Sequence, residues 1–114
     1  MISFACKPIN FQEILTCSFS MNKTEFFLFS FLEKQTDPLC VSTIAEMMGK
    51  DRTTIQKAMK SLAEKQIVNK HQVNLENGGY TFVYSLKNKE FLKKRMQQSV
   101  NDWLNAVNIQ IKKW

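Results

Sequence analysis

The most constraining feature of the sequence is a three-residue turn between two short amphipathic segments. The first segment ends at Met48, and the second runs from Asp51 to about Gln66. Gly49 ends the first helix as a left-handed C-cap, because glycine accepts positive φ at little cost. Asp51 is suited to cap the second helix. Two helices joined by so short a glycine-containing turn predict a helix-turn-helix.

The residue types around this turn favour a close pair of helices. Ala45 is small and lets the helices approach, Gly49 turns the chain, and Ile55 is a branched aliphatic that fills the gap between them. The string Thr43-Ile-Ala-Glu46 has the form of a capping box, so we expect the first helix to begin at residue 42 or 43.

Two helices are expected upstream of this pair. The first spans Asn10–Cys17, with apolar residues at helical spacing. The second begins at Asn22, where Asn22-Lys-Thr-Glu25 is another capping box, and continues to about Gln35. Its dense apolar row is expected to lie in the core, and consists of Phe26, Phe27, Phe29, Phe31 and Leu32.

The hydrophobic period changes after Gln66. Residues 67–73 and 80–84 are strand-like, and Asn77-Gly78-Gly79 between them is a turn signal, so a β-hairpin is predicted. Helical spacing returns from Lys87 and predicts an amphipathic helix of roughly 25 residues. Its apolar stripe consists of Leu92, Met96, Val100, Trp103, Val107, Ile111 and Trp114.

These elements predict a mainly α fold with one β-hairpin, of the α+β class. A chain of 114 residues is normally one domain. We therefore expect residues 1–114 to form a single domain, with a helix-turn-helix and hairpin core over about 10–86 and a C-terminal helix over about 87–114.

Positive charge is concentrated in one part of the chain. Residues 50–95 hold eleven Lys and Arg against four Asp and Glu, and this segment accounts for essentially all of the net charge of +6. Such a concentration is the pattern expected of a protein that binds a polyanion.

One face of the second helix of the pair carries polar side chains suited to DNA. Arg can bond guanine in a bidentate manner, Gln can bond adenine, Thr can contact a thymine methyl, and Lys suits phosphate. An ordinary solvated helix face is the alternative. The candidate residues on this helix and its turn are Lys50, Arg52, Thr53, Thr54, Gln56, Lys57 and Lys60.

The hairpin is a candidate wing beside this helix. Lys70 and His71 on its first strand, with Asn77 and Gly78 at its tip, are placed to reach a flanking DNA backbone or the minor groove. His71 taken by itself is better explained as an exposed strand residue.

Composition excludes several other functions. One His and three Gly leave no multi-histidine metal centre, phosphate-binding loop or dinucleotide fingerprint, so no metal, cofactor or catalysis is expected. No signal segment or membrane span is found, which predicts a soluble cytoplasmic protein with reduced thiols. Cys6, Cys17 and Cys40 are expected to be buried small hydrophobes, with redox regulation of DNA binding as the alternative.

The strings Gly49-Lys-Asp-Arg-Thr-Thr-Ile-Gln-Lys-Ala-Met-Lys-Ser-Leu-Ala-Glu-Lys65 and Gly78-Gly-Tyr-Thr-Phe-Val-Tyr84 resemble archaeal winged-helix transcription regulators akin to the MarR and TrmB groups. The resemblance extends from about Asn10 to the last helix. It implies a winged helix, a homodimer, and residues 51–65 as the recognition helix. It implies neither an operator nor an effector, and we expect no C-terminal effector domain of the kind found in sugar-sensing TrmB proteins.

The long last helix favours dimerisation independently, because a domain of this size has little other surface that could bury so long an apolar stripe. The alternative is that this helix folds back onto Phe11 and the Phe26–Phe31 cluster of its own chain. The functional prediction is a sequence-specific regulator that binds double-stranded DNA as a homodimer. A winged-helix module that binds proteins of the basal transcription machinery remains the rival prediction.

Overall fold

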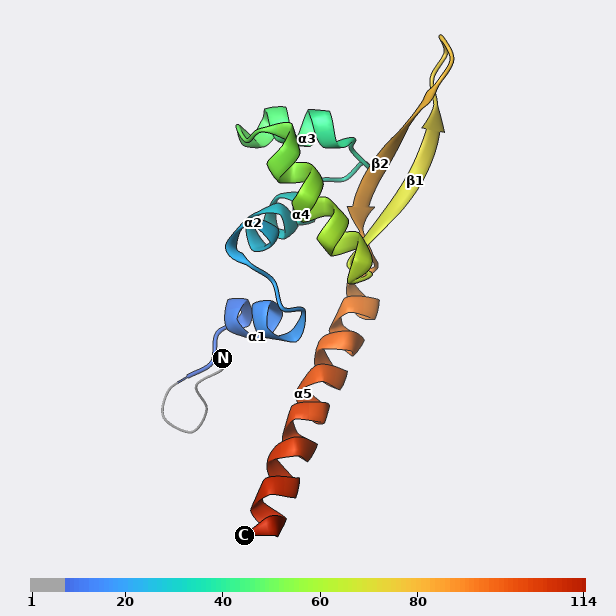
Figure 1. Cartoon of the computed structure of the whole chain (residues 1–114). Coiled ribbons are helices and arrows are strands. Elements are labelled where there is room, and N and C mark those ends of the chain that lie inside the picture. Colours follow the sequence, from blue (N-terminus) through green and yellow to red (C-terminus); the bar gives the residue numbers. More distant parts are fainter. Residues whose placement is uncertain (1–7) are drawn as a thin grey trace. The chain divides into compact units, whose positions relative to one another are not determined.

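A computed structural model describes residues 8–114 of the chain, which divides into two compact units. One unit consists of residues 22–87, and the other combines the residues up to 21 with residues 88–114. The described residues form five helices and one antiparallel hairpin (Figure 1). The predicted α+β class is therefore confirmed.

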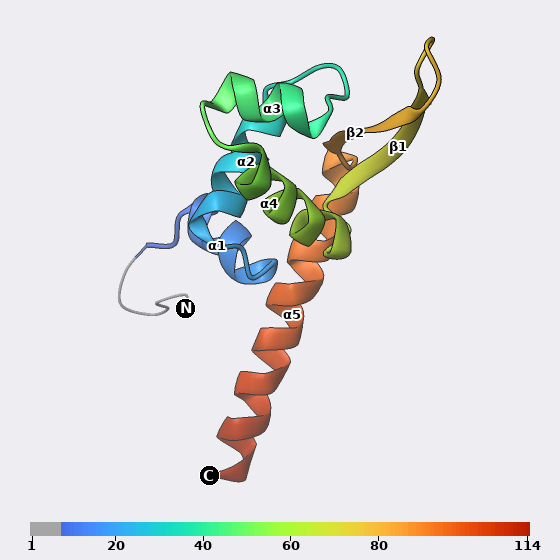
Figure 2. The same ribbon diagram turned by 45° about the horizontal axis from the view of Figure 1, so that its top comes forward.

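The unit of residues 22–87 contains three helices followed by the hairpin. In chain order its elements are α2 (Lys23–Glu33), α3 (Val41–Met48), α4 (Arg52–Glu64), β1 (Val68–Asn74) and β2 (Tyr80–Leu86). The three helices pack together, and each contacts one of the two strands. The tip of the hairpin projects away from them, as Figures 1 and 2 show from two directions.

The predicted start of α2 is confirmed in detail. The Asn22 side chain accepts a hydrogen bond from the Glu25 amide at 2.8 Å, and the Glu25 carboxylate accepts one from the Asn22 amide at 3.2 Å. The helix turns its Glu25, Leu28, Phe29 and Leu32 side inward. Phe27 lies off that side and is 46% exposed, so the expectation that the whole aromatic row is core is wrong at this residue.

The predicted start of α3 is wrong by one or two residues. The helix begins at Val41, and no side-chain hydrogen bond caps it, so the capping box expected at Thr43 and Glu46 is not formed. Cys40, and not Thr43, occupies the N-cap position. The extended chain before it is held by a residue that is distant in the sequence. Leu39 exchanges backbone hydrogen bonds of 3.0 and 2.8 Å with Tyr84 of β2, which holds the chain extended up to Cys40.

The turn between α3 and α4 forms as predicted. Gly49 has φ +66° and ψ 33°, the left-handed conformation of a C-cap. The Lys50 amide donates to the Ala45 carbonyl at 3.0 Å and closes the end of α3. Ala45 and Ile55 are buried on the two sides of this turn, as expected for a closely packed helix pair.

The core of this unit is built mainly from the inner faces of the helices and the base of the hairpin. Ile55, Met59 and Leu62 of the predicted α4 stripe are completely buried, and Ala63 is half-buried. Other buried apolar residues of the unit are Leu28, Phe29, Leu32, Val41, Ile44, Ala45, Ala58, Ile67, Val68 and Tyr84. This burial fixes which side of α4 is left for solvent.

The hairpin register determines which side chains share a face of the wing. Val68 pairs with Leu86 at the base, and Asn74 pairs with Tyr80 near the tip. Gly78 and Gly79 have φ of +89° and +79° in the connecting turn, which favours glycine. The predicted hairpin is thus confirmed, with the second strand extending two residues beyond Tyr84.

The other unit consists of α1 (Phe11–Ser18) and α5 (Lys89–Lys113). Asn10 caps α1 by accepting a hydrogen bond from the Glu13 amide at 2.8 Å. The two helices are in contact, and the Arg95 guanidinium of α5 lies 5.0 Å from the ring centroid of Phe19. The C-terminal half of α5 extends beyond α1 in both Figures 1 and 2.

Candidate nucleic-acid interface

The start of α4 is held by Asp51. Its carboxylate accepts hydrogen bonds from the Thr54 amide at 2.8 Å and from the Thr54 hydroxyl at 2.6 Å. The hydrogen bond from this hydroxyl is the largest cause that lowers the pKa of Asp51. Thr54 was a candidate DNA contact, but its hydroxyl is engaged in the helix cap and its side chain is half-buried.

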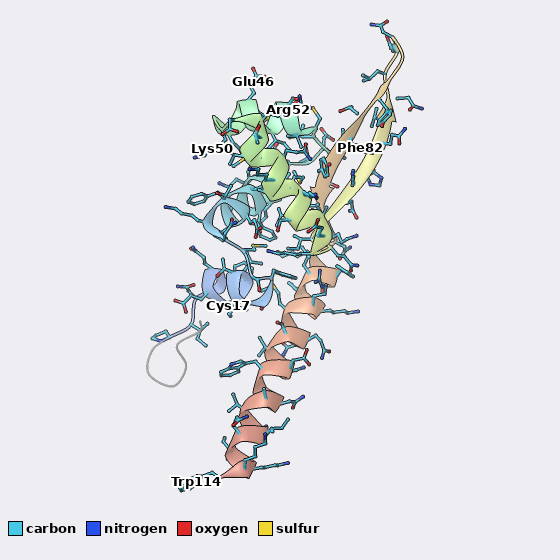
Figure 3. The ribbon with its side chains drawn as sticks, in the orientation of Figure 1. Cys17, Glu46, Lys50, Arg52, Phe82 and Trp114 are labelled. Carbon is cyan, nitrogen blue, oxygen red and sulfur yellow. The ribbon has the colours of Figure 1, made fainter. Side chains whose placement is uncertain are left out.

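The outer face of α4 presents the remaining candidates to solvent. Because Ile55, Met59 and Leu62 point into the core, the opposite side of the helix is free. Figure 3 shows Lys50 and Arg52 at the end of the unit where α3 meets α4. The exposed candidates of this α4 face are Lys50, Arg52, Thr53, Gln56, Lys57 and Lys60.

The two basic candidates of β1 lie on opposite faces of the wing. Lys70 pairs with Tyr84 and His71 with Val83 in the antiparallel register, so their side chains alternate. The Lys70 ammonium lies 4.1 Å from the Phe82 ring centroid, which places it on the aromatic face of the hairpin. His71 is exposed on the other face. The structure therefore does not bring Lys70 and His71 together.

The wing tip candidates lie in an exposed turn. Asn77 and Gly78 are both exposed between the two strands. The turn is closed by a hydrogen bond from the Leu75 amide to the Gly79 carbonyl at 3.1 Å, and by one from the Gly78 amide to the Leu75 carbonyl at 3.2 Å. These bonds fix the shape of the tip that the wing offers.

A cavity of about 300 Å³ lies between α4 and the aromatic face of the wing. We call it the α4–wing groove. It brings together two of the predicted DNA contacts of α4, Arg52 and Gln56, with Lys70 of β1. Its remaining lining comes from the start of α3 and from β2, and consists of Cys40, Val41, Ser42, Tyr80, Thr81, Phe82 and Tyr84.

Sequence reasoning missed the aromatic side of this groove. Tyr80, Phe82 and Tyr84 alternate along β2 and therefore share one face, and the register puts Lys70 on that face too. This alternation is present in the sequence, where it predicts a strand. Which residues lie opposite that strand depends on how distant segments pack, and spacing along the chain does not reveal it.

The cysteines differ from the expectation that they are buried. Cys17 is exposed and Cys40 is half-buried, while Cys6 lies outside the described residues. Cys40 occupies the N-cap position of α3, and its sulfur lies 3.2 Å from the Thr43 hydroxyl oxygen. Hydrogen bonding with that Thr43 side chain is the largest cause that lowers the pKa of Cys40.

The apolar stripe of α5 is buried at its N-terminal end and exposed at its C-terminal end. Leu92 is buried, Met96, Val100 and Val107 are half-buried, and Trp103 and Ile111 are 43% and 65% exposed. Trp114 is fully exposed. Phe11 of α1 is exposed as well. The second half of α5 therefore offers an apolar surface to solvent.

Within residues 8–114, no group of three or more His, Cys, Asp and Glu side chains is arranged to hold a metal ion. None of the helices in this range combines the length and hydropathy required to cross a membrane.

A helix-turn-helix followed by a two-stranded wing defines the winged-helix class of domains. Within that class, the chain belongs to the DnaD N-terminal domain family, whose model matches residues 15–107.

Individual relatives agree with this fold. A solved structure described as a possible transcriptional regulator from Methanosarcina mazei Go1 is 28% identical, with a TM-score of 0.88; the alignment covers 100% of this chain and 96% of that one. An uncharacterized protein of Methanocaldococcus jannaschii is 28% identical over 114 residues, which are all of this chain and 83% of that protein.

A more distant likeness concerns the fold alone. A MepR mutant of S. aureus, solved bound to an oligodeoxyribonucleotide, is 12% identical, with a TM-score of 0.55. The alignment covers 90% of this chain and 80% of the MepR chain.

Proposed function

We propose that the chain is a transcription regulator that binds double-stranded DNA in a sequence-specific manner, as a homodimer and without catalysis, in the cytoplasm. The observation that carries this proposal is the exposed α4 face, which presents cations and amide or hydroxyl groups while its opposite side is buried. The relative from Methanosarcina mazei, described as a possible transcriptional regulator, supports the same function.

The α4 face supplies both kinds of contact that a sequence-specific protein needs. Arg52 suits guanine O6 and N7, Gln56 suits adenine N6 and N7, and Thr53 suits a thymine methyl. Lys57 and Lys60 lie further along the helix and suit phosphates, which position the protein without reading sequence. Lys50 in the turn is a further phosphate contact.

The wing adds contacts beside the recognition helix. Lys70, Asn77 and Gly78 are exposed and are assigned to a flanking phosphate backbone or the minor groove. His71 lies on the opposite face of the strand from Lys70. In this proposal it contacts DNA only if the wing enters a groove of the DNA edge-on. We also propose that the chain is akin to the MarR and TrmB groups of winged-helix regulators.

We assign dimerisation to the apolar stripe of α5. Burial of its exposed aromatic and aliphatic side chains against a second copy removes apolar surface from water, which is the main favourable term in association. Two recognition helices related by a two-fold axis then match half-sites about one helical turn apart.

The test begins with selection of bound genomic DNA fragments by the purified protein. Gel shifts on a selected fragment then compare wild type with Arg52→Ala. Loss of one base contact is expected to weaken binding by about 1–3 kcal/mol and to relax specificity at one position. Lys34→Ala, at an exposed lysine that ends α2, is the matched control and retains full affinity. Unchanged binding by Arg52→Ala would remove α4 as the recognition helix.

A protein-interaction module of the basal transcription machinery is the second candidate. It is favoured by the exposed apolar side chains Val73 and Leu75 near the wing tip, which a DNA backbone does not require. Co-purification with polymerase components, together with absence of salt-sensitive DNA binding, would select this function over the first.

A further inference from the structure

The α4–wing groove has an aromatic side that the contacts proposed for paired DNA do not use. Two cations enter it from different elements, Arg52 from α4 and Lys70 from β1. Three aromatic side chains line its other side, and no carboxylate is among the lining residues. Positive charge and aromatic surface in one groove together indicate the chemical class of its ligand.

The two cations of the groove are available to an anionic ligand. Neither Arg52 nor Lys70 forms an ion pair with any described residue. The Lys70 ammonium lies over the Phe82 ring, 4.1 Å from its centroid, a cation–π contact on the wall of the groove. Figure 3 shows Arg52 at the start of α4 and Phe82 on the wing. Two such cations on one cavity suit a phosphate.

Tyr80 supplies a surface for a planar ring. Its ring meets Phe82 at 72°, with the ring centroids 5.5 Å apart, so the two rings are not stacked face to face. Tyr80 remains 58% exposed although it lines the cavity. Aromatic side chains in this state act as stacking platforms for nucleic-acid bases.

The neutral polar side chains of the groove and its volume restrict the class of ligand further. The side chains of Gln56, Ser42 and Thr81 add hydrogen-bond donors and acceptors of the kind that the edge of a base requires. A cavity of about 300 Å³ is at the lower end of ligand-site volumes, so it accommodates one small ligand and not a length of strand.

We propose that the α4–wing groove binds one nucleoside monophosphate unit. Its phosphate lies between Arg52 and Lys70, its base stacks on Tyr80, and the edge of the base is bonded by Gln56 and Ser42. The unit is either a free nucleotide or a single unpaired nucleotide of a DNA strand. Both have the same chemistry, and the experiment separates them.

The first arm uses the full chain without DNA. Adenosine 5′-monophosphate is titrated by calorimetry, while the alkylation rates of Cys40 and Cys17 are followed by peptide mass spectrometry. Bound nucleotide is expected to slow alkylation of Cys40, which lines the groove, at least about threefold. Cys17, exposed on α1, serves as the internal reference and keeps its rate.

Three variants and one matched control test stacking on Tyr80 and the charge of Lys70. Tyr80→Ala is expected to raise the dissociation constant at least about fivefold, since loss of one base–aromatic stack costs about 1–3 kcal/mol. Lys70→Gln is also expected to weaken binding several-fold. The matched control is Lys34→Gln, the same change at the exposed lysine that ends α2 and does not line the groove, which leaves binding unchanged. Tyr80→Phe keeps the ring, and therefore retains binding if Tyr80→Ala acts through stacking.

The second arm rests on the proposed DNA-binding function. A duplex with one unpaired adenosine is compared with the fully paired duplex of the same sequence. If the groove takes a nucleotide from a strand, the unpaired duplex binds at least about fivefold more tightly, and Tyr80→Ala removes that advantage. Nucleotide binding in the first arm alone identifies the free nucleotide as the ligand.

Failure of both arms overturns the proposal. It is also overturned if inorganic phosphate alone or benzoate alone protects Cys40 at the same concentration as the nucleotide, because the groove then does not recognise phosphate and base together. The DNA-binding function is tested separately by the fully paired duplex. If that duplex binds while both arms fail, the groove proposal fails alone; if only the free nucleotide binds, DNA binding fails alone.

Discussion

The Lys65 ammonium nitrogen lies 2.8 Å from Oε2 of Glu25, and this ion pair joins the end of α4 to the first turn of α2. Glu25 is a buried charged residue, and the same carboxylate completes the capping box with Asn22. One side chain therefore starts α2 and also fixes the end of the helix that carries the candidate DNA contacts.

Glu25→Gln is expected to lower the free energy of unfolding by about 2 kcal/mol, because it replaces charged hydrogen bonds at a buried position with neutral ones. Urea titration of both proteins measures the difference. Glu90→Gln is the control, since the Glu90–Lys93 pair is long at 3.5 Å and largely exposed, and it is expected to leave the midpoint nearly unchanged. Equal midpoints for all three proteins would contradict a structural role for Glu25.

The same residue predicts a pH dependence. Burial opposes ionisation of Glu25, but hydrogen bonds from Lys65, Ser61 and the Asn22 amide, with the charge of Lys65, together lower its pKa from 4.5. A carboxyl whose pKa is lower in the folded state contributes stability that is fully present above its unfolded pKa. That contribution is lost as pH falls below about 4.5 through the folded pKa. Glu25→Gln is expected to show a correspondingly smaller loss of stability over this range.

Gly49→Ala tests the turn of the helix pair. No atom lies within 4 Å of an added Cβ, so its cost comes from the backbone φ of +66° alone. We expect a loss of about 1 kcal/mol in thermal or urea unfolding. Gly49→Asn is expected to lose less, because Asn tolerates the left-handed region better. A gain in stability for Gly49→Ala would show that the turn does not depend on this conformation.

The local elements of this fold were predictable because their signals lie within a few residues. Asn22, Gly49 and Asp51 act through hydrogen bonds or backbone angles of their own segment. The buried stripe of α4 follows from helical period. For the same reason, the helical period also predicts which residues lie on the exposed face of α4.

What could not be predicted depends on contacts between distant segments. The extended segment before α3 is held by pairing of Leu39 with Tyr84, 45 positions later in the chain. The ion pair of Glu25 with Lys65 has the same origin. The α4–wing groove also requires four elements to meet, the start of α3, α4, β1 and β2, so its cations are predicted from the sequence but their aromatic neighbours are not.

Cys40 is expected to react with iodoacetamide at lower pH than an ordinary cysteine. Its pKa is lowered from 9.0, chiefly by hydrogen bonding with Thr43, which favours the reactive thiolate. Thr43→Val removes that hydroxyl and should move the pH profile of alkylation upward. A profile that stays in place would show that Thr43 does not control the thiol. Gel shifts before and after mild peroxide treatment then test whether DNA affinity responds to cysteine oxidation.

Lys57→Ala tests the assignment of phosphate contacts on α4. Removal of one phosphate contact is expected to reduce the salt dependence of DNA binding by about one unit and to weaken binding about equally on all sequences. Gel shifts on a selected and an unrelated fragment, at several salt concentrations, measure both effects. Weakening confined to the selected fragment would instead assign Lys57 to base recognition.

Ile111→Glu tests self-association through α5. Ile111 lies on the exposed part of the apolar stripe, and a charge there would be buried unpaired in a dimer. Wild type is therefore expected to be dimeric and Ile111→Glu monomeric by light scattering at the same concentration, with unchanged helix content. Asn105→Glu adds the same charge on the opposite, exposed side of α5 and should remain dimeric. Wild type that is monomeric at high micromolar concentration would remove the dimer from the proposed function.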